Sequence, residues 1–162
     1  MAEIASRQAS IMLRCGRQPG TDILSNFSAA TRFGDTLFLA ADEAARIESF
    51  RIDGEEAGCH RSFALGDFFD LADAEAEADL EGLAGEDGFL WVTGSHARTR
   101  PKPEKQPDET IDLRELANLR DTRPRCLLGR IPLVEDKDGW TPVARDGDRR
   151  AGLLRQREKG NS

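Results

Sequence analysis

The sequence predicts an all-β, mainly antiparallel fold with one inserted helix, namely a partial β-propeller of about two four-stranded blades. A pattern of strand, turn and strand recurs without a gap after 53 residues, so that Ser28 aligns with Glu81 and Glu43 with His96 (81 − 28 = 53). Each copy includes a strand that is apolar on both faces, as expected for a strand buried between two layers. Repeats with a period of this order are typical of stacked units such as propeller blades.

The first predicted unit, residues 25–70, contains four strands separated by glycine and aspartate turn signals. The strands are expected at Ser28–Thr31, Thr36–Ala41, Arg46–Ile52 and Cys59–Leu65. The second of these is apolar on both faces, whereas the last two alternate more and are predicted to be the outer strands of the blade.

The second predicted unit, residues 77–148, repeats this order around an insertion at 97–121. Its strands are expected at Leu80–Ala84, Phe89–Thr93, Arg125–Val134 and Trp140–Ala144. The insertion begins with a basic, proline-containing segment, typical of an exposed loop. Asp108 can then cap a helix over Glu109–Arg120. We expect the two units to pack face to face.

The two ends of the chain carry weaker signals. Residues 1–24 are predicted to be a lead-in segment with a strand at Ile11–Leu13, and residues 149–162 a charged tail with a helical turn at Ala151–Leu154.

Composition limits the class of protein. The 162 residues are 38% apolar and 33% charged, with a net charge of −7, which argues against a nucleic-acid binder. No apolar run approaches the roughly 20 residues that a membrane-spanning helix needs, and the N-terminus has no apolar signal-peptide core. The three cysteines are widely spaced and odd in number, which favours reduced thiols. We therefore expect a cytoplasmic protein.

Four motifs are specific in combination: His60–Leu71 (HRSFALGDFFDL), Asp79–Ala84 (DLEGLA), Leu90–His96 (LWVTGSH) and Leu128–Leu133 (LGRIPL). Together they resemble a bacterial domain-of-unknown-function family, number 3616. The resemblance covers roughly residues 25–154, and it implies a propeller-like fold in proteins about twice as long. It implies no established reaction, and only a distant similarity to phytase-like and lactonase-like propellers.

Two blades do not close a ring, because each blade of a propeller needs a neighbour on both faces. The sequence therefore predicts either a truncated copy of a longer propeller or a chain that self-associates through its exposed blade faces.

Strand direction brings polar residues to one rim, because the start of an innermost strand lies beside the end of its antiparallel neighbour. Asp79 and Glu81 should share this rim with Ser95 and His96, and in the first unit Ser28 should lie beside Asp42 and Glu43. Asp79 and Glu81 are candidate ligands for a divalent cation such as Ca²⁺, and His96 is a candidate catalytic acid or base. The alternative is that these groups only satisfy backbone and loop hydrogen bonds. The other histidine, His60, is predicted to be structural.

A small anionic ligand is the second chemical possibility. Arg98 and Arg100 follow the same rim and, with Ser95, can receive a phosphate or carboxylate. Basic residues between prolines are more often part of a solvated linker, so this alternative stays open.

Two functions remain. The first is a ligand-binding or scaffolding module with structural rim residues, and the alternative is a metal-assisted hydrolase of phosphate or ester substrates. The binding module is favoured because the sequence contains no complete catalytic constellation.

Overall fold

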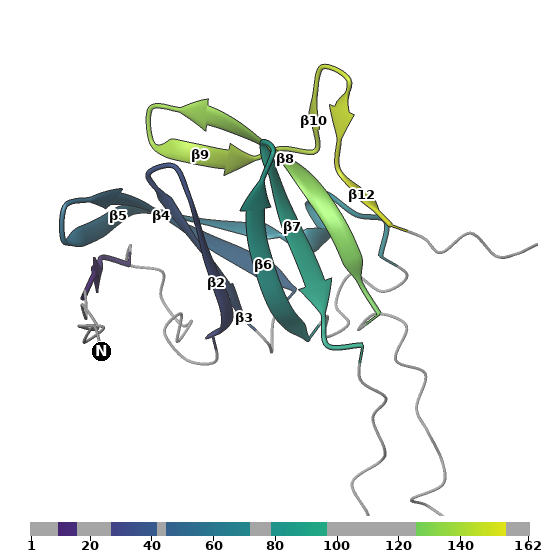
Figure 1. Ribbon diagram of the computed structural model, residues 1–162, viewed down its shortest axis with the longest axis horizontal. Helices are drawn as coiled ribbons and strands as arrows, with labels where there is room; N and C mark the ends of the chain where they lie inside the picture. The colour runs from purple at the N-terminus through teal and green to yellow at the C-terminus, as the bar shows by residue number, and fades with distance from the viewer. Residues whose placement is uncertain (1–9, 16–26, 42–44, 72–78, 97–125, 155–162) are drawn as a thin grey trace, which may run out of the picture.

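Two mainly antiparallel β-sheets form most of the molecule in the computed structural model, which describes residues 10–15, 27–41, 45–71, 79–96 and 126–154 (Figure 1). The predicted all-β partial propeller is therefore confirmed. The predicted helix over 109–120 lies outside the described residues.

The strand bounds follow the predicted order. The first sheet contains β1 (Met12–Leu13), β2 (Phe27–Phe33), β3 (Thr36–Ala41), β4 (Arg46–Asp53) and β5 (Glu56–Ala64), followed by a short 3₁₀ turn, η1 (Leu65–Asp67). The second contains β6 (Leu80–Glu86), β7 (Phe89–Gly94), β8 (Leu128–Asp136), β9 (Gly139–Pro142) and β12 (Gly152–Leu153). The first sheet has the order β1-β5-β4-β3-β2, with β1 parallel to β5. The second has the order β12-β8-β7-β6, with β9 paired to the far half of β8.

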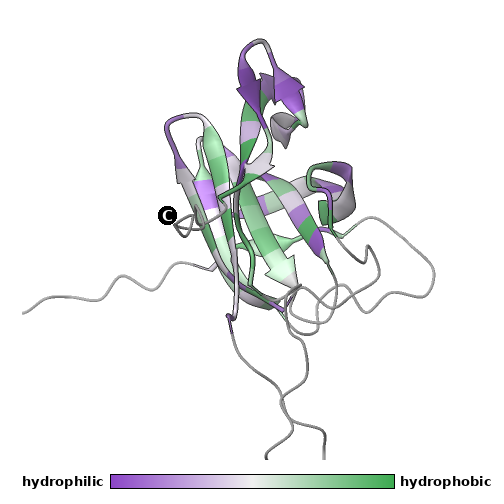
Figure 2. Ribbon diagram, turned by 90° about the vertical axis from the view of Figure 1, so that its right-hand side faces the viewer, coloured by the Kyte–Doolittle hydropathy of each residue, from purple (hydrophilic) through white to green (hydrophobic). Residues whose placement is uncertain are grey.

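The end of the described chain differs from its prediction. A small hairpin of β10 (Arg145–Asp146) and β11 (Arg149–Arg150) precedes β12, which pairs with β8 where a helical turn was expected. The hairpin is strongly hydrophilic and projects from the sheets (Figure 2). The backbone of β12 is held by the edge of β8, because the amide of Leu154 donates to the carbonyl of Leu128 at 2.7 Å. Hydrogen bonds to a neighbouring strand thus outweigh the weak helical pattern of residues 151–154.

The 53-residue repeat is preserved in the strand register. Ala30 pairs with Leu39 in the first sheet, and the residues 53 positions later, Leu83 and Val92, pair in the second. Each inner strand also has a β-bulge at the same place, with Ser28 and Glu81 as the two extra residues. The two sheets are therefore structural copies, including an irregularity that the sequence does not reveal.

The main core lies between the two sheets. It joins buried residues of both, including Phe38, Ala40, Leu90 and Val92. The inner strands β2 and β6 lie side by side at this contact (Figure 1). A smaller cluster of Leu39, Phe50 and Ala57 lies on the other side of the first sheet, partly covered by Leu13 and Cys15. We call this side the outer side of the first sheet.

The β8–β9 hairpin reaches across to the first sheet. Thr36 is fully buried and its hydroxyl oxygen accepts the Trp140 amide at 2.7 Å. Arg61 on β5 donates to Asp136 at 2.8 Å and to Thr141 at 2.7 Å. The contacts fix how the second sheet sits on the first. In the described residues, no helix is long and apolar enough to cross a bilayer.

Candidate functional site

The predicted rim exists at the ends of the inner strands of the second sheet. Leu80 pairs with Gly94, and the Ser95 amide donates to the Asp79 carbonyl at 2.9 Å. Asp79 and His96 both have positive φ, 46° and 53°. Residues other than glycine rarely adopt this backbone conformation. The surrounding hydrogen bonds must therefore hold the backbone in place at these two residues. Asp79 and Ser95 are thus brought together as predicted.

His96 is exposed, and its ring contacts the backbone of the segment before β8. Its Nε2 lies 3.2 Å from the carbonyl oxygen of Leu127. Because a carbonyl can only accept, Nε2 carries the proton and donates it to this bond. The same carbonyl also accepts the Gly94 amide at 2.8 Å. The imidazole therefore helps to tie the end of β7 to the residue before β8.

Ser28 and Glu81 hold equivalent bulge positions but make different contacts. The Ser28 hydroxyl donates to the Leu80 carbonyl, which links the inner strands of the two sheets, and it lies 3.3 Å from the Ala40 carbonyl. Glu81 is exposed. A carboxylate cannot donate as the hydroxyl does, so Glu81 does not repeat this link.

The other predicted site residues fall outside the described part of the chain. Arg98 and Arg100 lie in 97–125, and Asp42 and Glu43 in 42–44. Within the described ranges, no group of three or more histidine, cysteine, aspartate or glutamate side chains could hold a metal ion. The metal-ligand roles of Asp79 and Glu81 remain predictions.

A buried polar cluster lies elsewhere, on the outer side of the first sheet. The Glu48 and His60 side chains are 9% and 4% exposed, and His60 Nε2 lies 2.7 Å from Glu48 Oε2. The other carboxylate oxygen, Oε1, accepts the Ser62 hydroxyl at 2.7 Å. The His60 ring stacks on Phe50 with centroids 4.7 Å apart. Sequence reasoning treated His60 as structural and did not find its partners.

This cluster does not have the geometry of a nucleophilic triad. The Ser62 hydroxyl donates to Glu48 and also accepts two N–H groups of Arg46, at 2.9 and 2.8 Å. A catalytic serine needs its base on its own hydroxyl, whereas here serine and histidine both bind the carboxylate. The arrangement instead satisfies a buried carboxylate with several donors. In the sequence, this contact could be recognised only from the pairing of the two strands, because Glu48 lies directly opposite Ser62.

Cys15 lies at the border of the same cluster. Burial first, and then the negative charge of Glu48, raise the pKa of its thiol above the ordinary value. A raised pKa disfavours the thiolate, which is the nucleophilic form of cysteine. Cys15 therefore fits a packing role.

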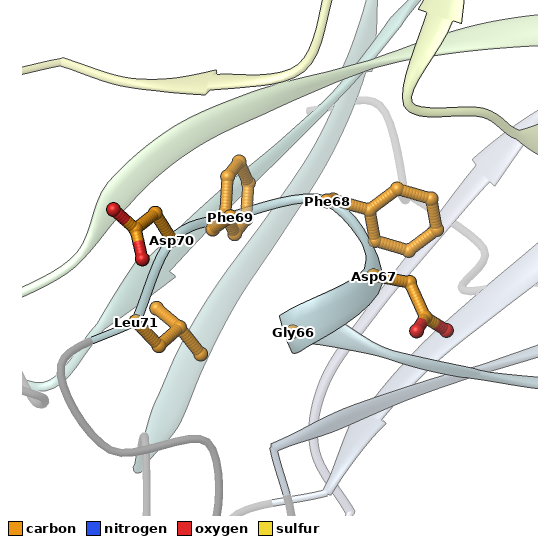
Figure 3. Close-up of a pocket in the computed structure, with 6 residues that line it drawn as sticks. All are labelled: Gly66, Asp67, Phe68, Phe69, Asp70 and Leu71. Carbon is orange, nitrogen blue, oxygen red and sulfur yellow. The ribbon is translucent and has the colours of Figure 1, made fainter.

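Two of the hollows in the described part of the chain could receive a ligand or a partner. One of about 490 Å³ is lined by the single segment 66–71, and Figure 3 shows the carboxylates of Asp67 and Asp70 on either side of Phe68 and Phe69. The other, of about 250 Å³, is a mainly apolar groove on the side of the second sheet that faces away from the first. Of the residues around it, Gly82, Ala84, Trp91, Thr93 and Leu128 lie on this side by strand register, whereas Leu83 and Val92 belong to the core on the opposite side. We call this side the outer side of the second sheet.

Comparison with protein families finds a match over most of the chain. The family model described as protein of unknown function (DUF3616) matches residues 26–162, in agreement with the resemblance of the motifs. No curated protein and no solved structure matches the chain.

Proposed function

The chain belongs to the DUF3616 family, and from its geometry we propose that it is a scaffolding or ligand-binding module of the propeller type. One observation carries the proposal: the rim contacts hold strands together. The Ser28 hydroxyl links the two sheets, the Ser95 amide closes onto Asp79, and the His96 imidazole donates to Leu127. Groups that make such hydrogen bonds between strands have a structural role. The groove on the outer side of the second sheet is lined instead by apolar side chains.

The alternative is a metal-assisted hydrolase with Asp79 and Glu81 as ligands and His96 as acid or base. Nothing in the described residues favours it. A bound Ca²⁺ takes six to eight oxygen ligands, and a catalytic site usually needs at least three protein ligands. Carboxylates that are exposed at a rim, such as Glu81, are compatible with simple solvation.

A thermal shift assay separates the two functions. We expect Ca²⁺, Mg²⁺ and Zn²⁺ to leave the melting temperature of the full chain unchanged, in the wild type and in Glu81→Gln. Glu135→Gln is a matched control, since Glu135 is an exposed glutamate far from the rim. A metal-dependent rise that Glu81→Gln abolishes and Glu135→Gln retains would instead support the hydrolase.

The proposed ligand of the module is a small anion held by Ser95, Arg98 and Arg100. Inorganic phosphate is the probe: it should raise the melting temperature of the wild type and have less effect on the double variant Arg98→Gln/Arg100→Gln. A cytoplasmic location is part of the same proposal, and it is supported by the three cysteines, all of which are free thiols.

A further inference from the structure

The 53-residue repeat makes the outer sides of the two sheets complementary to each other. In the first sheet, Phe38 and Ala40 face the second sheet, whereas Leu37 and Leu39 face outward. The residues 53 positions after Phe38 and Ala40 are Trp91 and Thr93, which line the outer groove of the second sheet.

The converse also holds. The residues 53 positions after Leu37 and Leu39 are Leu90 and Val92, which are buried against the first sheet. The second sheet thus turns outward the side that is covered in the first sheet. In the first sheet the outward side is buried at Leu39, Phe50 and Ala57, and it is open along β2, where Ala30 and Arg32 are exposed. The two units stack in the same sense, as successive members of a head-to-tail series.

We propose that the outer side of the second sheet binds the outer side of the first sheet of a second copy of this chain, in a head-to-tail contact that repeats the internal one. The inference rests on the proposed scaffolding function and names its partner. Such a contact is heterologous, so it continues to further copies until a ring closes.

Charge complementarity supports a second copy as the partner. Inside the chain, Gly85 on β6 leaves space for the ring of Phe33 on β2, because a Cβ on Gly85 would lie 2.8 Å from Phe33 Cδ2. In the repeated contact, Glu86 takes the place of Phe33, and Arg32 of the next copy takes the place of Gly85. The contact therefore brings opposite charges together.

Glu86 and Arg32 are available for this pair. Both are exposed, and each alternates along its strand with a residue of the internal contact, so both face outward. The Arg32 side chain donates one N–H, from Nε, to the Gly34 carbonyl at 2.8 Å. This bond uses one of the five N–H groups of a guanidinium.

The apolar residues of the two outer sides also support a contact with a second copy. Leu128 is 40% exposed at one end of the groove, and Trp91 lies in its wall under the guanidinium of Arg130. Aromatic residues with arginine are typical of the central part of protein interfaces. On the partner side, Leu37 and Phe27 are partly buried at the edge of the smaller cluster.

Glu81 weakens the proposed contact. In the internal contact the Ser28 hydroxyl donates to the Leu80 carbonyl, and the equivalent pair between copies is Glu81 with the Phe27 carbonyl. Two acceptors then face each other. Glu81→Ser supplies the missing donor and should tighten association several-fold.

Sedimentation velocity of the full chain over a concentration series tests the proposal. The wild type should associate as its concentration rises. Arg32→Glu and Glu86→Arg should each weaken association about tenfold, because each places like charges in the contact, and salt should reduce the difference. An equimolar mixture of the two variants should associate again, since every contact between the two kinds of chain then carries opposite charges.

The control is that both variants keep the circular dichroism and melting temperature of the wild type, as expected for exposed positions. Trp91→Ala is an independent variant, which should weaken association without changing charge. A wild type that stays monomeric at millimolar concentration, or a mixture that does not associate, overturns the proposal. So does a loss of association in Glu86→Arg but not in Arg32→Glu, which would indicate a symmetric contact between two second sheets. None of these outcomes changes the metal response that tests the scaffolding function.

Discussion

Phe33 fills the space that the missing side chain of Gly85 leaves between the two sheets. A Cβ on Gly85 would lie 2.8 Å from Cδ2 and 3.0 Å from Cβ of Phe33. The Phe33 ring is in turn held edge-on by Trp140, with ring centroids 4.8 Å apart. The inner strand of one sheet, the inner strand of the other and the β8–β9 hairpin therefore meet at this one aromatic side chain.

Gly85→Ala should separate the sheets. The added methyl group has no room unless Phe33 moves, and Phe33 is confined by Trp140, so we expect a loss of about 1–3 kcal/mol in the free energy of unfolding. Urea unfolding measures it. Gly58→Ala is the matched control, because a Cβ at Gly58 meets nothing within 4 Å. Equal stability of the two variants would show that the inter-sheet contact is looser than the structure describes.

His60→Phe tests the buried cluster. The variant keeps an aromatic ring on Phe50 but removes the donor to Glu48, whose side chain is only 9% exposed. An under-satisfied buried carboxylate should cost about 1–3 kcal/mol of unfolding free energy. Adding Glu48→Gln should recover part of this loss, because a neutral amide is less costly to bury. Additive effects in the double-mutant cycle would contradict a direct His60–Glu48 interaction.

Asp136 should make the contact between the sheets sensitive to acid. Hydrogen bonds from the Thr141 hydroxyl, the Asp138 amide and the Arg61 guanidinium lower the pKa of its carboxyl group from 3.8 to about 2. A carboxyl group whose pKa is lower in the folded state stabilises the fold above its unfolded pKa. This contribution is lost as the pH falls from about 4 towards 2.

The size of this contribution is limited by solvent. The Asp136 side chain is 39% exposed, so water screens its ion pair and we expect about 1 kcal/mol. Asp136→Asn should lower the free energy of unfolding at pH 7 and flatten its decline between pH 4 and pH 2. Asp53→Asn, at an exposed hairpin position, is the control. A decline of the same slope in Asp136→Asn and wild type would rule out Asp136 as its source.

Local sequence patterns predicted the order and type of the strands. The 53-residue offset between Ser28 and Glu81 holds in the register of both inner hairpins. It could be found because strand periodicity and turn residues act over short distances. The bulges at these two positions could not, since an extra residue in a ladder depends on how two strands pair.

The buried cluster was missed for a related reason. Glu48 and His60 are twelve residues apart on neighbouring strands, and a register shift between Ser49 and Arg51 intervenes. Alternation alone indicates that each is on an outer strand. It does not indicate that one carboxylate binds both His60 and Ser62.

The sequence by itself determined a repeated antiparallel unit, its turns and the apolar strands that must be covered. The tertiary structure decided what the polar residues of that unit contact. His96 donates to the carbonyl of Leu127, which is 31 residues further along the chain, and Ser28 donates to Leu80, 52 residues away. Hydrogen bonds of this kind depend on distances of a few ångströms between segments that are remote in sequence. Periodicity carries no information about such distances, because it records only which side of a strand each residue faces.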